Sequence, residues 1–207
     1  MTKLARNALA IAAIVLGAAA GAADLEEGRR LYAQCALCHG ANGEGHAAMR
    51  APPLAARESW YIERQLELFR NGLRGVDEAD IYGRQMAAAS LTLWDQREAR
   101  AVAAFTAALP AAAQERTVRG KAARGAKLYE SCAGCHGAAA EGTAELGAPQ
   151  LSGLPDWYVV AQLQLYRAGA RGTAATDTPG QTMRSAAAAL PNEQALNDVA
   201  AYLSALD

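Results

Sequence analysis

Apolar residues recur at helical spacing in six stretches of the chain, three in each half. Apolar positions that follow one another at intervals of three and four residues lie on one face of a helix. The stretches cover residues 25–34, 60–70, 95–109, 122–131, 156–166 and 192–206. Between them, the segments over 40–53 and 71–83 contain glycine and proline and are predicted to be loops. No stretch alternates apolar and polar residues as a half-buried strand does, so the pattern predicts an all-α protein.

The second half of the chain repeats the first half at a constant shift of 97 positions. Between residues 25–109 and 122–206, about 34 of the 85 aligned pairs are identical, and the alignment needs no gap. Each copy has roughly ninety residues, which is enough to fold as a domain. We therefore predict two tandem domains, at 24–110 and 121–207, joined by a linker over 111–120.

Residues 1–23 have the pattern of an export signal. Lys3 and Arg6 precede an apolar run over 8–20, and small residues follow at 21–23. We predict cleavage after Ala23 and a location in the periplasm. An uncleaved leader that tethers the chain to the membrane is the alternative, although the run is shorter than the roughly 20 residues of a typical membrane span.

The chain carries 20 basic and 21 acidic side chains, so its formal net charge is −1. Nucleic-acid-binding proteins are typically basic, and this balance argues against that class. We expect membrane contact only through partners or through an uncleaved leader.

The charge is uneven, because residues 24–115 hold ten Arg against thirteen acidic residues and residues 116–207 hold eight of each sign. A basic group near the linker forms either a solvated helix face or a docking surface for an acidic partner. It consists of Arg116, Arg119, Lys121, Arg124 and Lys127.

All four cysteines belong to two copies of the pattern C-x-x-C-H. The copies are Cys35-Ala36-Leu37-Cys38-His39 and Cys132-Ala133-Gly134-Cys135-His136. In this pattern the two thiols form thioether bonds to haem, and the adjoining histidine binds the iron. Two copies inside one repeat of an exported chain predict two covalently bound haems c, with His39 and His136 as iron ligands.

Three other uses of these cysteines agree less well with the sequence. A structural zinc site needs four ligands, and the second copy offers only Cys132, Cys135 and His136. A thioredoxin-like redox pair belongs to a βαβ unit, whereas the pattern here is helical. A disulfide within C-x-x-C would close too short a loop to stabilise the chain appreciably.

A methionine is the expected second ligand of each iron. In the second copy Met183 is the only His or Met left beside His136, so we predict Met183 there. The first copy offers His46, Met49 and Met86, and only Met86 aligns with a methionine in the repeat. A core methionine that merely fills space is the alternative for Met86. Its flanking residues are predicted to form a loop, which argues against that alternative.

The whole mature chain resembles the dihaem class I c-type cytochromes, and in particular the cytochrome c4 group. The resemblance rests on three segments that occur in both copies. In the first copy they are Gly28-x-x-Leu31-Tyr32, Ala51-Pro52-Pro53-Leu54 and Tyr61-x-x-x-Gln65-Leu66-x-x-Phe69-x-x-Gly72-x-Arg74. In the second they are Gly125-x-x-Leu128-Tyr129, Ala148-Pro149-Gln150-Leu151 and Tyr158-x-x-x-Gln162-Leu163-x-x-Tyr166-x-x-Gly169-x-Arg171. The chain departs from the family at Trp94, which aligns with Pro191, and at Pro53, where asparagine is more usual.

The resemblance implies that each iron-binding histidine donates its Nδ1 proton to a proline carbonyl. The pairs are His39 with Pro52 and His136 with Pro149. It also implies that the first helix of each copy packs across the last helix, near Phe105 and near Tyr202. Arg74 and Arg171 become candidates for contact with the haem propionates. A salt-bridged surface arginine is the alternative role for both.

An iron held by histidine and methionine has no open position, so it exchanges electrons and does not bind a substrate. The resemblance therefore implies a non-enzymatic electron carrier of a respiratory chain that passes single electrons to a terminal oxidase. Its donor would be a quinol-oxidising complex or a dehydrogenase. The alternative is an electron-accepting subunit of a periplasmic oxidoreductase, such as flavocytochrome c sulfide dehydrogenase. A peroxidase-like enzyme would need one haem unlike the other, and the matching Met86 and Met183 argue against it.

Overall fold

The computed structural model describes residues 24–206, which fold into helices joined by turns. This part of the chain contains no strand, and its β-type contacts are two isolated bridges, His46 with Ala51 and Thr143 with Ala148. The all-α prediction is therefore confirmed. None of the helices described is long and apolar enough to cross a membrane. The export signal predicted over 1–23 lies outside the described residues.

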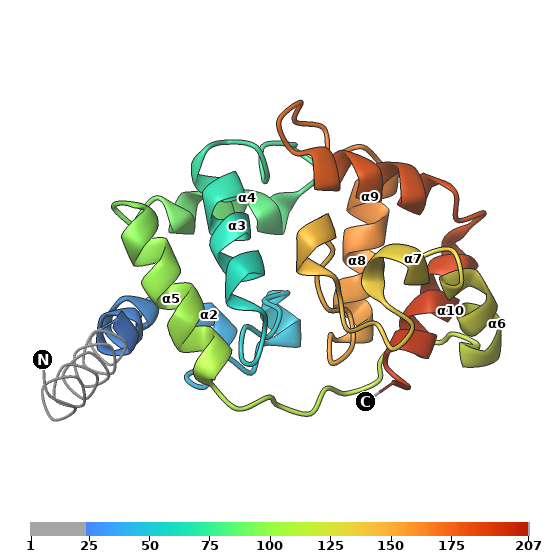
Figure 1. Cartoon of the computed structure of the whole chain (residues 1–207), viewed down its shortest axis with the longest axis horizontal. Helices are drawn as coiled ribbons and strands as arrows, with labels where there is room; N and C mark the ends of the chain where they lie inside the picture. The colour runs from blue at the N-terminus through green and yellow to red at the C-terminus, as the bar shows by residue number, and fades with distance from the viewer. Residues whose placement is uncertain (1–23, 207) are drawn as a thin grey trace, which may run out of the picture.

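The two copies of the repeat form two helical units that lie side by side, with residues 110–121 running between them without a helix (Figure 1). The first unit begins with a helix over 24–32. It continues with α2 (Ala36–His39), the 3-10 helix η1 (Ala47–Met49), α3 (Ser59–Arg70), α4 (Ile81–Ser90) and α5 (Gln96–Ala108). The second unit contains α6 (Ala122–Tyr129), α7 (Ala133–His136), η2 (Ala144–Leu146), α8 (Asp156–Arg167), α9 (Thr178–Ala188) and α10 (Glu193–Leu203).

The six helices predicted from apolar periodicity are present, but α4 and α9 were not predicted. The loop expected around Met86 is therefore wrong, because Met86 lies within α4. Each of these helices begins at an aspartate whose side chain accepts a hydrogen bond from a backbone N–H of the first turn, Gly83 for Asp80 and Gly180 for Asp177. Such a cap satisfies an otherwise unpaired donor. The alanines that follow favour a helix, yet they give almost no apolar periodicity to detect.

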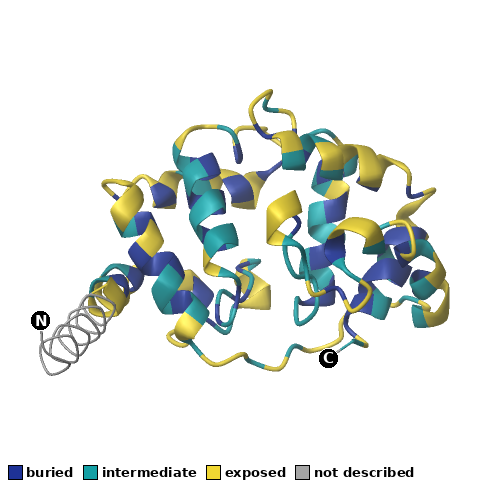
Figure 2. Ribbon diagram, in the orientation of Figure 1, coloured by how far each residue is buried: buried dark blue, intermediate teal, exposed yellow. Residues whose placement is uncertain are grey.

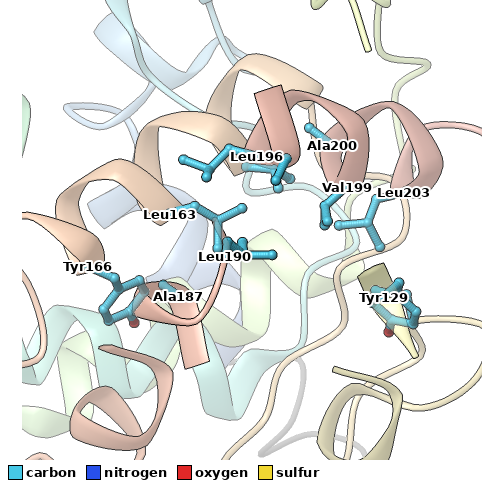
Figure 3. Close-up of a cluster of buried hydrophobic side chains, with 12 residues drawn as sticks. Tyr129, Leu163, Tyr166, Ala187, Leu190, Leu196, Val199, Ala200 and Leu203 are labelled. Atoms are coloured by element: carbon cyan, nitrogen blue, oxygen red, sulfur yellow. The ribbon is translucent and has the colours of Figure 1, made fainter. Parts of the chain in front are cut away.

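Each unit has its own apolar core. In the first, Tyr32, Ile62, Leu66, Leu93 and Val102 are among the buried residues that pack together. The core of the second unit draws side chains from α6, α8 and α10 and from the end of α9 (Figures 2 and 3). Its members include Tyr129, Leu163, Tyr166, Leu190, Leu196, Val199 and Leu203. Two separate cores are what two tandem copies of one folding unit require.

The first and last helices of each unit approach so closely that only glycine fits at the crossing. A Cβ at Gly28 would collide with the carbonyl group of Ala101, and a Cβ at Gly125 would collide with that of Asp198. Aromatic rings pack beside each crossing, with ring centroids 5.4 Å apart for Tyr32 and Phe105 and 5.3 Å apart for Tyr129 and Tyr202. The predicted packing of the first helix across the last is confirmed in both units.

All five members of the basic group near the linker are exposed, two of them in the linker and three at the start of the second unit. One of its members, Arg124, forms an ion pair with the buried carboxylate of Asp198, which also accepts a hydrogen bond from the backbone N–H of Lys121 at 2.8 Å. Burial alone would raise the pKa of Asp198, but these donors outweigh it and lower the pKa. The start of the second unit is thereby attached to α10.

The substitution Gly125→Val should destabilise the second unit, because the new side chain would push α6 away from α10. Overpacking of this kind costs about 1–3 kcal/mol, more than the helix propensity that valine gains over glycine. Thermal unfolding measures the loss. Ala123→Val, at an exposed position of the same helix, is the control and should change stability by less than about 0.5 kcal/mol. Equal effects of the two substitutions would contradict the close helix crossing.

Candidate haem-binding sites

Each C-x-x-C-H segment forms a single helical turn that brings its three functional side chains to one face. In the first unit this turn is α2, and the backbone N–H of His39 donates to the carbonyl of Cys35 at 2.9 Å. The turn α7 repeats this bond between His136 and Cys132 at 3.0 Å. Positions i, i+3 and i+4 share one side of a helix. None of the four cysteines forms a disulfide, and in each pair one is half-buried and the other exposed.

The histidine rings are fixed by a hydrogen bond to a proline carbonyl in both units. The Nδ1 atom of His39 lies 2.7 Å from the carbonyl oxygen of Pro52, and that of His136 lies 2.8 Å from the oxygen of Pro149. Since a carbonyl only accepts, Nδ1 carries the proton and donates it. Burial lowers the pKa of both histidines, and the carbonyl contact offsets only part of this effect. Each imidazole is therefore neutral near pH 7, with Nε2 free to bind a metal.

Tyrosine hydroxyls hold the chain that leaves each histidine. Tyr32 donates to the carbonyl of Gly40 at 2.7 Å, and Tyr129 donates to that of Gly137 at 2.8 Å. Both glycines have φ above +80°, a conformation that disfavours other residues. The chain can therefore turn back sharply after each histidine and bring the proline carbonyl to its ring.

The three methionines among the described residues and the remaining histidine, His46, differ clearly in burial. Met86 is packed against the core of the first unit together with Cys35, and Met183 is packed against the core of the second together with Cys132. His46 and Met49, the other candidates in the first unit, are exposed beside η1. The structure thus brings the repeated methionine of each unit, and neither alternative, to the core that the cysteines border.

In the second unit the predicted site residues line one cavity. Cys132, Cys135, His136, Met183 and Pro149 all contribute to its wall. Most of the remaining wall is apolar or aromatic, and it includes Leu151, Leu154, Tyr158, Val159, Leu163, Tyr166, Leu190, Val199 and Leu203. Two thiols, an imidazole nitrogen and a thioether around an apolar cavity fit a covalently bound haem. Among residues 24–206, no three His, Cys, Asp or Glu side chains gather to hold a metal ion by themselves.

Arg74 and Arg171 lie buried at the contact between the units, with 8% and 6% of their surface exposed. Arg74 donates to Gln65 of its own unit at 2.6 Å and to Gln162 of the other at 3.0 Å. Arg171 mirrors this with Gln162 at 2.5 Å and Gln65 at 3.0 Å, and adds the hydroxyl of Tyr61 at 3.1 Å. The alternative of a salt-bridged surface arginine is wrong for both, because within the described chain neither forms an ion pair.

Two buried cations without a carboxylate are costly. Their hydrogen bonds end on neutral oxygens, and the Nε of Arg74 is buried with no partner among the described residues. The electrostatic effect is visible in Tyr61: its burial would raise its pKa, but Arg171 and Arg74 outweigh this and lower the pKa. A ligand with carboxylates would complete this arrangement, and haem carries two propionates.

Further contacts join the units around these arginines. Arg64 of α3 forms an ion pair with Asp177 at the start of α9 at 2.7 Å, and the carboxylate of Glu58 accepts from the backbone N–H of Gln150 at 2.7 Å. The guanidinium of Arg50 lies 5.1 Å from the centre of the Trp157 ring. None of these contacts was predicted. The only sequence signal for a contact between the units was the repeat of a polar residue, Gln65 and Gln162, at equivalent positions of an otherwise apolar helix face.

Two helical units, each with a C-x-x-C-H turn, a proline-bonded histidine and a half-buried methionine, define a c-type cytochrome with two haems. A model of the cytochrome c family matches residues 25–109 and 122–207. The chain belongs to the cytochrome c family, and within it to the dihaem class I proteins that are similar to cytochrome c4.

Two named relatives are similar to this chain over most of its length. The chain is 34% identical over 197 residues to the thiosulfate dehydrogenase electron acceptor of Stutzerimonas stutzeri (strain A1501), an alignment that covers 84% of this chain and 85% of the relative. It is also 34% identical over 201 residues to cytochrome c4 of Azotobacter vinelandii, covering 92% and 91%.

Two solved structures share the fold. Thiosulfate dehydrogenase from Marichromatium purpuratum superposes with a TM-score of 0.71 and 30% identity, over 87% of this chain and 40% of that one. Reduced cytochrome c4 from Pseudomonas stutzeri superposes with a TM-score of 0.68 and 24% identity, over 86% and 96%. The second likeness shows the fold alone.

The substitution Arg171→Gln should weaken the contact between the units. It removes the charged donor to Tyr61 and Gln65, and a hydrogen bond from a charged group contributes about 1.5–3 kcal/mol. We expect calorimetry of the haem-loaded protein to show a lower unfolding temperature and two separable transitions. Arg97→Gln replaces an exposed arginine of α5 and serves as the control. A single unchanged transition in Arg171→Gln would contradict a structural role for this contact.

Proposed function

We propose that this dihaem cytochrome is an exported, periplasmic electron carrier that passes single electrons to a terminal oxidase of a respiratory chain. Its donor would be a quinol-oxidising complex or a dehydrogenase. The observation that carries the proposal is the arrangement found in both units: a neutral, carbonyl-bonded histidine follows the two thiols, and a half-buried methionine packs against the same core. The proposed mature protein has domains at 24–110 and 121–207 with a linker over 111–120.

Residues of this chain would hold each haem and supply two ligands to its iron. Cys35 and Cys38, and in the second unit Cys132 and Cys135, would form the thioether bonds. His39 and His136 would bind through Nε2, because Nδ1 is already engaged. Met86 and Met183 would each supply the second protein ligand through the thioether sulfur. Haem c, when bound, supplies an iron that gains or loses one electron, and two protein ligands per iron would leave no position for a substrate.

Arg74 and Arg171 would neutralise the haem propionates. Their buried guanidinium groups lack an anion in the protein chain, and bonds between arginine and carboxylate are among the strongest hydrogen bonds of proteins. The apolar walls exclude water from the rest of the group and favour the iron state with less net charge. The chain's contribution is thus to fix the ligands and the polarity around them.

A second candidate function is supported by the similarity to thiosulfate dehydrogenase electron acceptors and to a solved thiosulfate dehydrogenase. In this alternative the chain is the electron-accepting partner of a periplasmic oxidoreductase that acts on a small sulfur compound. Purification from the native host separates the two functions. A free monomer that membranes oxidise rapidly supports the carrier, whereas a stable stoichiometric complex with a dehydrogenase supports the acceptor subunit.

The reduced protein should not bind carbon monoxide at either haem. Its absorption spectrum before and after addition of the gas should be the same, because a methionine blocks the open side of each iron. A change in one haem's share of the spectrum would reveal an open iron. That result would show that the iron of one unit lacks its methionine ligand, and it would favour an enzymatic function.

The substitutions Met86→Ala and Met183→Ala should each open one iron and leave the other unchanged. We expect carbon monoxide to bind the altered haem in the reduced state, and the midpoint potential of that haem to fall, since methionine ligation raises the potential. Met49→Ala, at an exposed position, is the matched control. A variant whose two haems both keep their spectra and potentials would show that the substituted methionine is not a ligand.

A further inference from the structure

The hydrogen bonds of the two buried arginines between the units occur in matching pairs. Arg74 donates to Gln65 and Gln162, and Arg171 donates to the same two glutamines from the other unit. Because positions 97 apart are equivalent, each bond of this set has a counterpart in which the units are exchanged. A contact without such a counterpart therefore makes one haem site different from the other.

One ion pair between the units has no counterpart. Arg64 of α3 binds the carboxylate of Asp177 at 2.7 Å, and Asp177 caps α9. The position equivalent to Arg64 in the second unit is occupied by Ala161, and the position equivalent to Asp177 in the first unit is occupied by Asp80. An alanine carries no charge, and among the described residues Asp80 forms no ion pair.

Asp80 is nevertheless as deeply buried as Asp177, with 3% and 6% of their surfaces exposed. Its Oδ1 accepts from the backbone N–H of Gly83 at 2.8 Å, whereas its Oδ2 is buried and meets no donor within residues 24–206. In Asp177 the Oδ1 atom accepts both from the backbone of Gly180 at 3.2 Å and from Arg64 at 2.7 Å. Water screens a buried charge only weakly, so an unneutralised carboxylate acts strongly on the groups around it.

Arg50 does not supply the missing cation. It occupies the position that Gly147 has in the second unit. Its guanidinium lies 5.1 Å from the centre of the Trp157 ring and 6.0 Å from that of Tyr82. No ion pair joins it to Asp80 in the described part of the chain. The first unit thus keeps a carboxylate at the start of α4 that lacks the cation found at the start of α9.

Both aspartates belong to the surroundings of a predicted haem site. Asp177 lines the same cavity as the predicted ligand Met183, and Arg64 reaches the wall of that cavity from the first unit. Asp177 lies six residues before Met183, and Asp80 lies six residues before Met86. Each aspartate caps the helix that carries the predicted methionine ligand. A charge at either position therefore lies close enough to influence the iron of its unit.

We propose that Arg64 is a positioning residue of the second haem site, which acts across the contact between the units by neutralising Asp177, and that Ala161 leaves the first site with the unneutralised Asp80. The inference rests on the proposed electron-carrier function and adds the residues that make the two sites unequal. An oxidised iron carries one more positive charge than a reduced one, so a nearby carboxylate favours the oxidised state.

This charge difference gives electron exchange within the chain a direction. One electron leaves the ferrous iron of the first unit, which becomes ferric, and reduces the ferric iron of the second unit, while no atom moves. Asp80 stabilises the ferric product in the first unit. Arg64 prevents Asp177 from doing the same in the second, so the electron is held there.

The experiment measures the midpoint potential of each haem in the haem-loaded protein. Redox titration is followed by NMR of the haem methyl groups, and the signals of the second haem are those that Met183→Ala alters. Arg64→Gln keeps a hydrogen-bond donor for Asp177 but removes the charge, so the potential of the second haem should fall and that of the first should stay. The equilibrium constant for electron exchange should change at least about threefold, which is roughly 28 mV at about 59 mV per tenfold change.

Asp80→Asn tests the first site. Asparagine keeps an acceptor for the backbone N–H of Gly83 and is an equally good helix cap, but it carries no charge. We expect the potential of the first haem to rise by a similar factor, while the potential of the second stays as in the wild type.

Three further variants separate charge from structure. Arg64→Lys keeps the positive charge and should keep the wild-type potentials. Arg64→Gln combined with Asp177→Asn removes both charges, so the potential of the second haem should return toward that of the wild type although the lost ion pair still lowers the unfolding temperature. Arg100→Gln breaks the ion pair of an exposed arginine with Glu63 and should leave both potentials unchanged.

The outcomes distinguish this inference from the proposed function. If Arg64→Gln lowers the unfolding temperature but moves neither potential, Arg64 is purely structural and the inference is overturned. An unchanged first potential in Asp80→Asn would equally overturn the charge difference between the sites. Carbon monoxide binding by the reduced wild type would instead reject the carrier function, and the shifts in potential would still be read from the same titration.

Discussion

The hydrogen bond from histidine Nδ1 to the carbonyl of a proline thirteen residues later is the interaction on which each unit depends. It selects the tautomer that leaves Nε2 free, while burial keeps the imidazole neutral. The rest of the local structure serves this contact. The single helical turn sets the thiols beside the histidine, the left-handed glycine after it reverses the chain, and the tyrosine hydroxyl holds that reversal in place. Losing the carbonyl contact would free the ring to rotate away from the iron.

Identity between the two units is concentrated where the chain surrounds the haem or packs its helices. The thiols, histidines, prolines, half-buried methionines and glycines of the helix crossings are all repeated, because few other residues could meet the geometric requirement at each of these positions. The exposed positions follow no such demand, and there the units differ, as at Leu37 against Gly134 and Trp94 against Pro191. A protein that holds two similar redox groups needs two similar interiors. If only one unit binds a given partner, the two units need different surfaces.

Much of the fold was predictable from the sequence, since the repeat fixed the number of units and the apolar periodicity located the main helices. The haem attachment residues were predictable because C-x-x-C-H combines three reactive groups at one helical spacing. Helices α4 and α9 could not be predicted in this way, because a capping aspartate followed by alanines produces almost no apolar periodicity. The contact between the units was not predictable either. Gln65 and Gln162 look like ordinary helix residues until the structure brings a guanidinium from the other unit to each of them.

That contact also explains why the two units belong together in one chain. Each buried arginine is bonded to a glutamine of its own unit and to the glutamine of the other, so neither unit can satisfy its arginine alone. In a separated unit the guanidinium would be exposed to water, which screens it and weakens its hold on any carboxylate nearby. Association of the units thus creates the low-polarity environment in which an arginine can strongly neutralise a propionate. The tandem arrangement thus gives both arginines a buried environment that neither unit provides alone.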